Sequence, residues 1–235
     1  ERSLNLVDRA LLLVDSSEGP LPQTRFVLKK ALEKDLPIIL VINKIDRTDA
    51  RVEEVIDEVY DLFIDLDANE NQIEFPIIYT NAKNGIAHTS LDKESTSLEP
   101  LFETILSEIK GPLADDNKEA QFLITSLDYD SYVGQIAIGR LTSGKLRMSE
   151  NYALCSEDKI EHNQKLSALY TFDGLKRVQV DQVEAGDIIA IAGIDGLTIG
   201  DTISDNEVPS ALPRIMVDEP TVSMLFYVND SPFAG

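Results

Sequence analysis

The stretch Pro37-Ile38-Ile39-Leu40-Val41-Ile42-Asn43-Lys44-Ile45-Asp46 decides the fold of the first part of the chain. Its apolar run, 38–42, is mostly β-branched, which is typical of a strand buried on both faces of a parallel sheet. Three polar residues, Asn43, Lys44 and Asp46, follow directly after that run. Because open α/β sheets bind ligands at the carboxyl ends of their strands, the sequence predicts a binding site here.

The three polar groups match the edge of a guanine base. The carboxylate of Asp46 can accept hydrogen bonds from the ring N–H and the exocyclic amine, and the amide of Asn43 can donate to the imidazole nitrogen. The aliphatic stem of Lys44 can lie along the ring face. Adenine presents the opposite pattern of donors and acceptors, so a carboxylate at this position rejects it. An ordinary polar turn is the alternative, because three fixed residues in four positions are a weak motif alone.

A second polar loop supports the guanine interpretation. It runs from Thr80 to Gly85 and follows another apolar strand, Phe75–Tyr79. The carboxyl ends of neighbouring parallel strands share one edge of a sheet, so backbone N–H groups of this loop can meet the base carbonyl. Two loops in the right order favour a base-binding site over a pair of ordinary turns.

Residues 1–112 alternate apolar strands with amphipathic helices, which predicts parallel strands joined by right-handed crossovers. The first strand is Ala10–Val14, and helices are expected from Pro22, after an Asp49 cap, and over Leu98–Ile109. The apolar stripe of the first helix is expected at Phe26, Val27, Ala31 and Leu32.

Three strands make half of a doubly wound sheet. The strand Ala10–Val14 is too apolar for a comfortable exposed edge, so we expect a missing amino-terminal half. Without that half, the edge is expected to be poorly ordered or covered by a second copy in an edge-strand dimer. The absence of an initial Met and the end at Gly235, just after an apolar stretch, also suggest a segment of a longer protein.

From Glu119 the pattern changes to short strands separated by Gly and Asp turns, which predicts a small β-barrel. Residues 207–218 are interpreted as a linker, and Pro220–Val228 as the first strand of an α+β domain. The expected fold class is therefore a partial, mostly parallel α/β sheet (1–112), an all-β barrel (113–206), and a linker with the start of an α+β domain (207–235). The strands predicted for the barrel are Gln121–Leu127, Gly134–Leu141, Asn151–Cys155, Lys165–Phe172, Arg177–Val180 and Ile188–Gly193.

The charge and cysteine content restrict the class of protein. The net charge is −21 and spread along the chain, with 12 basic and 22 acidic residues in 1–112 and 8 and 16 in 113–206. No part offers the basic face that gripping nucleic acid requires, so direct DNA binding is not expected. The single Cys155 excludes an internal disulfide and suggests a reducing, cytoplasmic compartment. No apolar run reaches membrane-spanning length and nothing resembles a signal peptide, so no membrane partner is expected.

The chain lacks the parts that hold a triphosphate. The nearest match to a Gly-rich phosphate loop, Gly139–Leu146, has no hydroxyl residue after Lys145 and falls between two predicted strands, so it is interpreted as a hairpin turn. No Asp-x-x-Gly occurs in the first domain. His88 and His162 are too far apart to indicate a metal site and are expected at the surface. We therefore expect no catalytic residue and no metal ligand in the chain.

The sequence resembles the BipA (TypA) family of translational GTPases. The resemblance runs end to end. It rests on Leu11-Leu12-Leu13-Val14-Asp15, Glu18-Gly19-Pro20-x-Pro22-Gln23-Thr24-Arg25-Phe26, Asn43-Lys44-Ile45-Asp46-Arg47, Asp128-Tyr129-Asp130-x-Tyr132-x-Gly134, Gly174-Leu175-x-Arg177 and Ala185-Gly186-Asp187-Ile188.

This resemblance implies a GTP-binding domain in which Asn43, Lys44 and Asp46 bind the guanine of GTP or GDP. It further implies that Ala82 offers its backbone N–H to the base oxygen, with Asn81 and Lys83 on either side. The sequence departs from the family at Asn81, where Ser is usual, although Asn can still hydrogen-bond to Asp46. The family's phosphate loop, Mg²⁺ ligands and catalytic histidine would precede Glu1, and its RNA-contacting domain would follow Gly235.

The function implied is that of a segment of a ribosome-associated GTPase, with a role in large-subunit assembly and stress adaptation. The segment alone is expected not to hydrolyse GTP. Two alternatives stay open. One is a non-catalytic ribosome- or protein-interaction module with vestigial nucleotide loops, and the other is a different elongation-factor-like GTPase.

Overall fold

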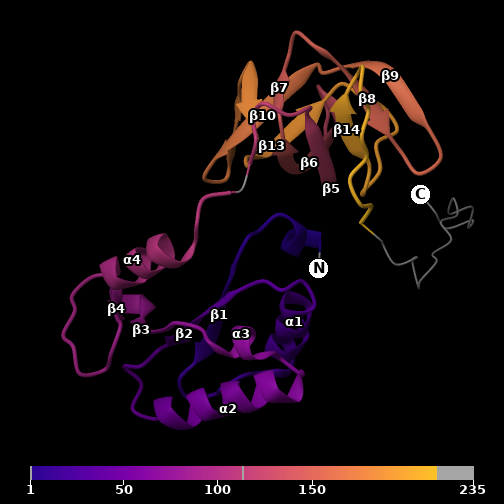
Figure 1. The fold of residues 1–235 in the computed structure, drawn as a ribbon. Coiled ribbons are helices and arrows are strands. Elements are labelled where there is room, and N and C mark those ends of the chain that lie inside the picture. Colours follow the sequence, from indigo (N-terminus) through magenta and orange to yellow (C-terminus); the bar gives the residue numbers. More distant parts are fainter. Residues whose placement is uncertain (1, 113, 216–235) are drawn as a thin grey trace, which may run out of the picture.

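A computed structural model describes residues 2–112 and 114–215, which form an α/β unit followed by a β unit (Figure 1). Helix α4 (Glu99–Glu108) is the last helix of the first unit, and strand β5 (Gln121–Asp130) is the first strand of the second. The strand predicted at Pro220–Val228, and with it the start of a third domain, lies outside the described residues.

The α/β unit is built on a four-stranded sheet in the order β1-β2-β3-β4. Strands β1 (Ala10–Asp15), β2 (Ile38–Asn43) and β3 (Ile77–Asn81) are parallel, as predicted. The short strand β4 (Ile86–His88) is antiparallel to β3 and was not predicted. Three residues are too few to show a strand period, and this one forms because Gly85 takes φ +68° and turns the chain back along β3.

The helices of this unit are α1 (Pro22–Leu32), α2 (Val52–Asp65), the one-turn α3 (Glu70–Ile73) and α4 (Glu99–Glu108). Short α3 was not predicted. The core between the sheet and helices α1 and α2 contains Leu12, Val14, Leu28, Ala31, Leu40, Ile42, Val55, Val59 and Phe63.

Two predictions about these helices are wrong. Phe26 and Val27 of α1 are 60% and 53% exposed, whereas Leu28 is 1% exposed. The buried stripe of α1 is therefore Leu28, Ala31 and Leu32, because that spacing faces one side of a helix. Asp49 does not cap α2: the N-cap position is Arg51, and the Asp49 carboxylate instead accepts two hydrogen bonds from Arg47.

Strand β1 lies at the edge of the sheet, pairing within the described residues only with β2. Leu13 is 61% exposed and Leu11 is 47% exposed, on the opposite face of the strand from the buried Leu12 and Val14. The strand forms as predicted, and the expectation that its free edge is either poorly ordered or covered by a second copy stays a prediction. Pairing with β2 along six residues is enough to define the strand.

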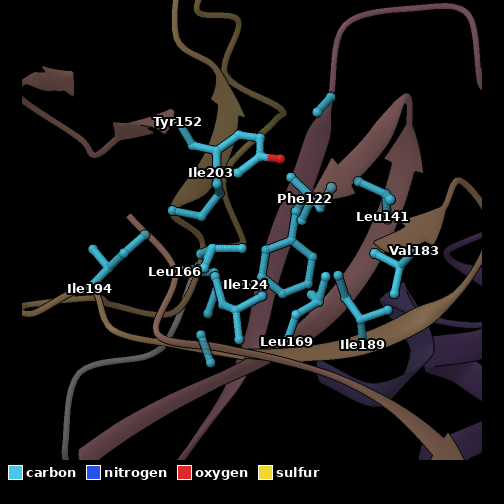
Figure 2. Close-up of a cluster of buried hydrophobic side chains, with 14 of the residues drawn as sticks. Phe122, Ile124, Leu141, Tyr152, Leu166, Leu169, Val183, Ile189, Ile194 and Ile203 are labelled. Atoms are coloured by element: carbon cyan, nitrogen blue, oxygen red, sulfur yellow. The ribbon is translucent and has the colours of Figure 1, made fainter. Parts of the chain in front are cut away.

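The second unit is barrel-like, with an eight-stranded sheet in the order β11-β10-β13-β6-β5-β14-β8-β9 and a two-stranded sheet β12-β7. The sheets enclose a core to which Phe122, Ile124 and Leu169 contribute (Figure 2). The strands are β5 (Gln121–Asp130), β6 (Gly134–Ser143), β7 (Lys145–Arg147), β8 (Asn151–Cys155), β9 (Ile160–Lys165), β10 (Ala168–Asp173), β11 (Lys176–Gln179), β12 (Gln182–Glu184), β13 (Ile188–Ala192) and β14 (Thr202–Asp205).

The six predicted barrel strands are present, β8 with the predicted ends and the other five with shifted ends, but β7, β9, β12 and β14 were not predicted. The interpretation of Gly139–Leu146 as a hairpin is also wrong. Strand β6 pairs with β5 and β13, whereas β7 pairs with β12, so the turn at Gly144 passes the chain from one sheet to the other. Gly144 has φ +71°, and a Cβ there would lie 2.6 Å from the backbone nitrogen of Ala120.

Candidate base-binding site at the carboxyl end of the parallel sheet

One pocket of about 330 Å³ lies where strands β2 and β3 end. Its lining consists of all six predicted site residues and one more cation: Asn43, Lys44, Asp46, Asn81, Ala82, Lys83 and Arg47. The volume lies at the lower end of the range of ligand pockets in proteins. The fold therefore brings together two loops that are almost forty residues apart in sequence.

Asn43 connects these two loops. Its Oδ1 atom accepts hydrogen bonds from Thr80 Oγ1 at 3.0 Å and from the backbone N–H of Ala82 at 3.1 Å. Both bonds use the oxygen, so the Nδ2 group remains the donor that faces the ligand space. Thr80 was not predicted as a site residue, although it is buried and pairs in register with Asn43. The sequence feature that could have identified Thr80 is a hydroxyl residue at the end of β3, the strand next to β2.

Two contacts that the sequence allows in the second loop are replaced by others. The Ala82 N–H was expected to meet the base oxygen, but it donates to Asn43. Asn81 is able to hydrogen-bond to Asp46, but in the structure its Oδ1 atom accepts from the backbone N–H of Asn84 at 3.2 Å. Asn81 thereby caps the short helix η2 (Ala82–Asn84), which sets the shape of this loop.

Lys44 is held by a residue outside the predicted set. Its backbone has φ +65°, a left-handed conformation that is uncommon for a side chain of this kind. Its Nζ atom lies 2.6 Å from Asp15 Oδ2 at the end of β1. Hydrogen bonding from Lys44, assisted by the N–H groups of Ser17 and Glu18 and opposed by burial, lowers the pKa of Asp15 to about 2. The same pairing raises the pKa of Lys44.

The loop after β1 is tied to the base loop through Ser16, which is fully buried. Its hydroxyl donates to the carbonyl oxygen of Lys44 at 2.9 Å, and its N–H donates to the carbonyl oxygen of Asn43, also at 2.9 Å. Arg51 extends the connection to helix α2 by donating through Nε to Ser17 O at 2.8 Å. Ser16 and Arg51 were not predicted to support the site, because their contacts depend on the register of β1 against β2.

Clustered metal ligands are absent from the part of the chain that the structure describes. Within 2–112 and 114–215, no group of three or more His, Cys, Asp or Glu side chains is arranged to hold a metal ion. His88 lies on strand β4 and His162 on strand β9. The Nδ1 atom of His88 contacts the carbonyl oxygen of Lys93, and the Nδ1 atom of His162 contacts that of Asn206. The expectation that this chain contributes no Mg²⁺ ligand stays a prediction, because Mg²⁺ in nucleotide sites is also held by Ser or Thr hydroxyls and by the phosphates themselves. None of the helices described there has the length and apolar character to cross a membrane.

Comparison with known proteins agrees with this geometry. Residues 1–111 match the family model of the elongation factor Tu GTP binding domain, and residues 134–204 match that of elongation factor Tu domain 2. The chain is 44% identical over all 235 residues to the large ribosomal subunit assembly factor BipA of Bacillus subtilis. The corresponding protein of Synechocystis is 47% identical over the same length. The chain belongs to the BipA family.

The BipA-family chain spans 38% of the length of the Bacillus relative and 39% of that of the Synechocystis relative. Its fold is shared with other translation factors. Elongation factor SelB from Methanococcus maripaludis superimposes with a TM-score of 0.66 at 19% identity, over 87% of this chain and 41% of SelB. GDP-bound aIF5B from Aeropyrum pernix gives a TM-score of 0.59 at 19% identity, over 85% of this chain and 39% of aIF5B.

Proposed function

We propose that the pocket at the ends of β2 and β3 binds the guanine base of GTP or GDP in a BipA-type GTPase. The observation that carries the proposal is the position of Asn43, whose oxygen holds the second loop in place through Thr80 and Ala82. A side-chain amide fixed in this way presents its NH₂ group in a set direction, as recognition of the imidazole nitrogen of a purine requires.

The remaining groups of the pocket complete the recognition of guanine. Asp46 is exposed in the pocket and accepts from the ring N–H and the exocyclic amine of guanine. Because the Ala82 N–H is taken by Asn43, the Lys83 N–H is the donor for the base oxygen. Asn81 contributes indirectly by capping the loop. The methylene groups of Lys44 cover one face of the ring.

Phosphate binding and hydrolysis lie outside this chain in the proposal. We propose that the phosphate loop and the Mg²⁺ ligands are supplied by other parts of the protein, and that this chain alone does not turn over GTP. We assign residues 1–112 to a GTP-binding domain, 113–206 to the barrel domain, and 207–235 to a linker and the start of an α+β domain. The two family-model matches support the first two assignments.

For the whole protein we propose a cytoplasmic, ribosome-associated GTPase that acts in large-ribosomal-subunit assembly and in stress adaptation. The relatives named as large ribosomal subunit assembly factors support this. With a net charge of −21, the contacts of this chain with ribosomal RNA are local, and neither DNA nor a membrane is a partner. An edge-strand dimer through β1 is a further possibility for the isolated chain, since that edge is uncovered in the described part.

The base-reading role is tested by titrating the ¹⁵N-labelled chain with guanosine and with adenosine. We expect guanosine alone to shift the amide signals of Asn43, Asp46, Ala82 and Lys83, and Asp46→Ala to abolish these shifts. Asp57→Ala, on the solvated side of helix α2, is the matched control and leaves them unchanged. Equal responses to the two nucleosides, or none to either, would favour the non-catalytic interaction module.

The division of labour is tested with a chimera in which residues 1–235 replace the matching segment of Bacillus subtilis BipA. We expect the chimera to hydrolyse GTP and to lose most of that activity with Asp46→Ala, while the isolated chain shows no turnover. Turnover by the isolated chain that Asp46→Ala blocks would overturn the assignment of hydrolysis to other parts.

A further inference from the structure

The base-reading carboxylate of Asp46 lies between two cations in sequence, Lys44 and Arg47, and both line the same pocket. A lysine or arginine this close normally pairs with a free carboxylate. Within the described residues Asp46 nevertheless makes no ion pair, because each cation is paired elsewhere. Lys44 pairs with Asp15, and Arg47 donates two hydrogen bonds to Asp49 at 2.8 and 2.7 Å.

We propose that Asp15 is a positioning residue for guanine selectivity, because it holds Lys44 away from Asp46 and so keeps that carboxylate available to the base. This inference rests on the proposed guanine-binding function and assigns a role to a residue that does not line the base pocket.

The carboxylate of Asp15 is oriented for this role. Its Oδ1 atom accepts from the N–H groups of Ser17 at 2.9 Å and Glu18 at 3.3 Å, which fixes the side chain at the end of β1. Its Oδ2 atom is buried and faces Lys44 Nζ at 2.6 Å, with an Arg47 nitrogen at 3.8 Å. One side chain is therefore directed at both cations that flank Asp46.

The backbone supports the same arrangement. The left-handed conformation of Lys44 turns its side chain toward β1, and the buried hydroxyl of Ser16 holds the Lys44 carbonyl in that conformation. Register decides the contact, because Asp15 pairs with Asn43 across strands β1 and β2. The carboxylate of Asp15 therefore lies beside the residue that follows Asn43.

The test compares Asp15→Asn, Lys44→Met and the double variant in the 235-residue chain, by guanosine titration. Losing an ion pair at a half-exposed lysine allows Lys44 to compete for Asp46, so we expect Asp15→Asn to weaken guanosine binding about three- to fivefold. Met keeps the unbranched stem of Lys44 but removes the charge. We therefore expect Lys44→Met to bind guanosine more tightly than Asp15→Asn, and we expect no further loss when Asp15→Asn is added to Lys44→Met, which a purely structural role of Asp15 does not predict.

A second measurement needs no nucleotide. In Asp15→Asn we expect the amide signals of Asp46 and Arg47 to shift as Lys44 turns toward Asp46, and to return in the double variant. Asp128→Asn, which removes the Asp128–Arg177 pair in the barrel, is the matched control and leaves these signals unchanged. If wild-type chain binds no guanosine, the proposed function fails, and the amide signals alone decide the inference.

Three results would overturn the inference. The first is wild-type guanosine affinity or unshifted Asp46 signals in Asp15→Asn. The second is a double variant that stays as weak as Asp15→Asn although its spectrum is folded. The third is a Lys44→Met variant as weak as Asp15→Asn, which would mean that the pair itself, and not the freedom of Asp46, supports binding. If Asp15→Asn does not fold, a loss of guanosine affinity of about three- to fivefold in Lys44→Met would overturn the inference in the same way.

Discussion

Arg140 on strand β6 donates two hydrogen bonds to the carboxylate of Asp8, at 2.9 and 2.8 Å, and so joins the barrel to the segment that precedes β1. The Arg140 side chain is only 15% exposed. A pocket of about 640 Å³ adjoins this pair between the two units, with Arg9, Lys110 and Gly186 in its lining. The pair is thus a direct link between the two units.

We predict that the Asp8–Arg140 pair has a coupling free energy of about 1 kcal/mol, because two parallel bonds to a shielded guanidinium exceed an ordinary surface pair. A double-mutant cycle with Asp8→Asn and Arg140→Gln, followed by urea unfolding, measures it. Small-angle scattering should show a larger radius of gyration for either variant. Glu150→Gln, which breaks an exposed pair within the barrel, should leave the radius unchanged. A coupling near zero would show that other contacts place the two units.

The low pKa of Asp15 predicts a specific acid sensitivity. Its folded pKa of about 2 lies below the unfolded value near 3.8, so its stabilisation is fully present above pH 4 and is lost as the pH falls through 2. After screening by solvent we expect about 1 kcal/mol of unfolding free energy. Urea unfolding of wild type and Asp15→Asn at pH 5, 3 and 2 measures it, and the two stabilities should converge toward pH 2. A constant difference over this range would contradict the assignment.

Cys155 should react only when the barrel opens. The side chain is buried on β8, and burial raises the pKa of its thiol, so both access and the thiolate fraction are low in the folded state. We expect a thiol reagent such as dithionitrobenzoate to label the native chain at least about a hundredfold more slowly than the unfolded chain. Added urea should accelerate labelling in step with unfolding. The fully unfolded chain is the control and should show one reactive thiol. Fast labelling without denaturant would mean that β8 is exposed.

Gly139 should tolerate no side chain, because strands β5 and β6 approach closely there. A Cβ at Gly139 would lie 1.9 Å from the carbonyl oxygen of Leu123, which is backbone and cannot turn away. We predict that Gly139→Ala lowers the unfolding free energy by about 3 kcal/mol. Gly134→Ala is the matched control on the same strand, where φ is +79° but no atom lies within 4 Å, and it should cost about 1 kcal/mol. Equal losses for the two variants would show that conformational strain, and not the close approach, decides.

The sequence alone determined the parallel strands, the long helices and the position of the candidate site. Continuous apolar runs mark β1 and β2, and the helical spacing of apolar residues marks α2 and α4. The signal is clearest in α2, because Val55, Val59, Leu62 and Phe63 are buried along the helix. It was also predictable that the six candidate residues share one pocket, because the ends of neighbouring parallel strands must meet at one edge of the sheet.

Only the tertiary structure decided how those site residues are used. The short strands β4, β7 and β12 have three residues each and exist through their pairing, so no local period marks them. The contacts of Asn43 with Ala82 and of Lys44 with Asp15 require strands from distant parts of the chain to align in one register. A sequence fixes which groups follow each strand, but the partner of each group depends on the strand that lies beside it.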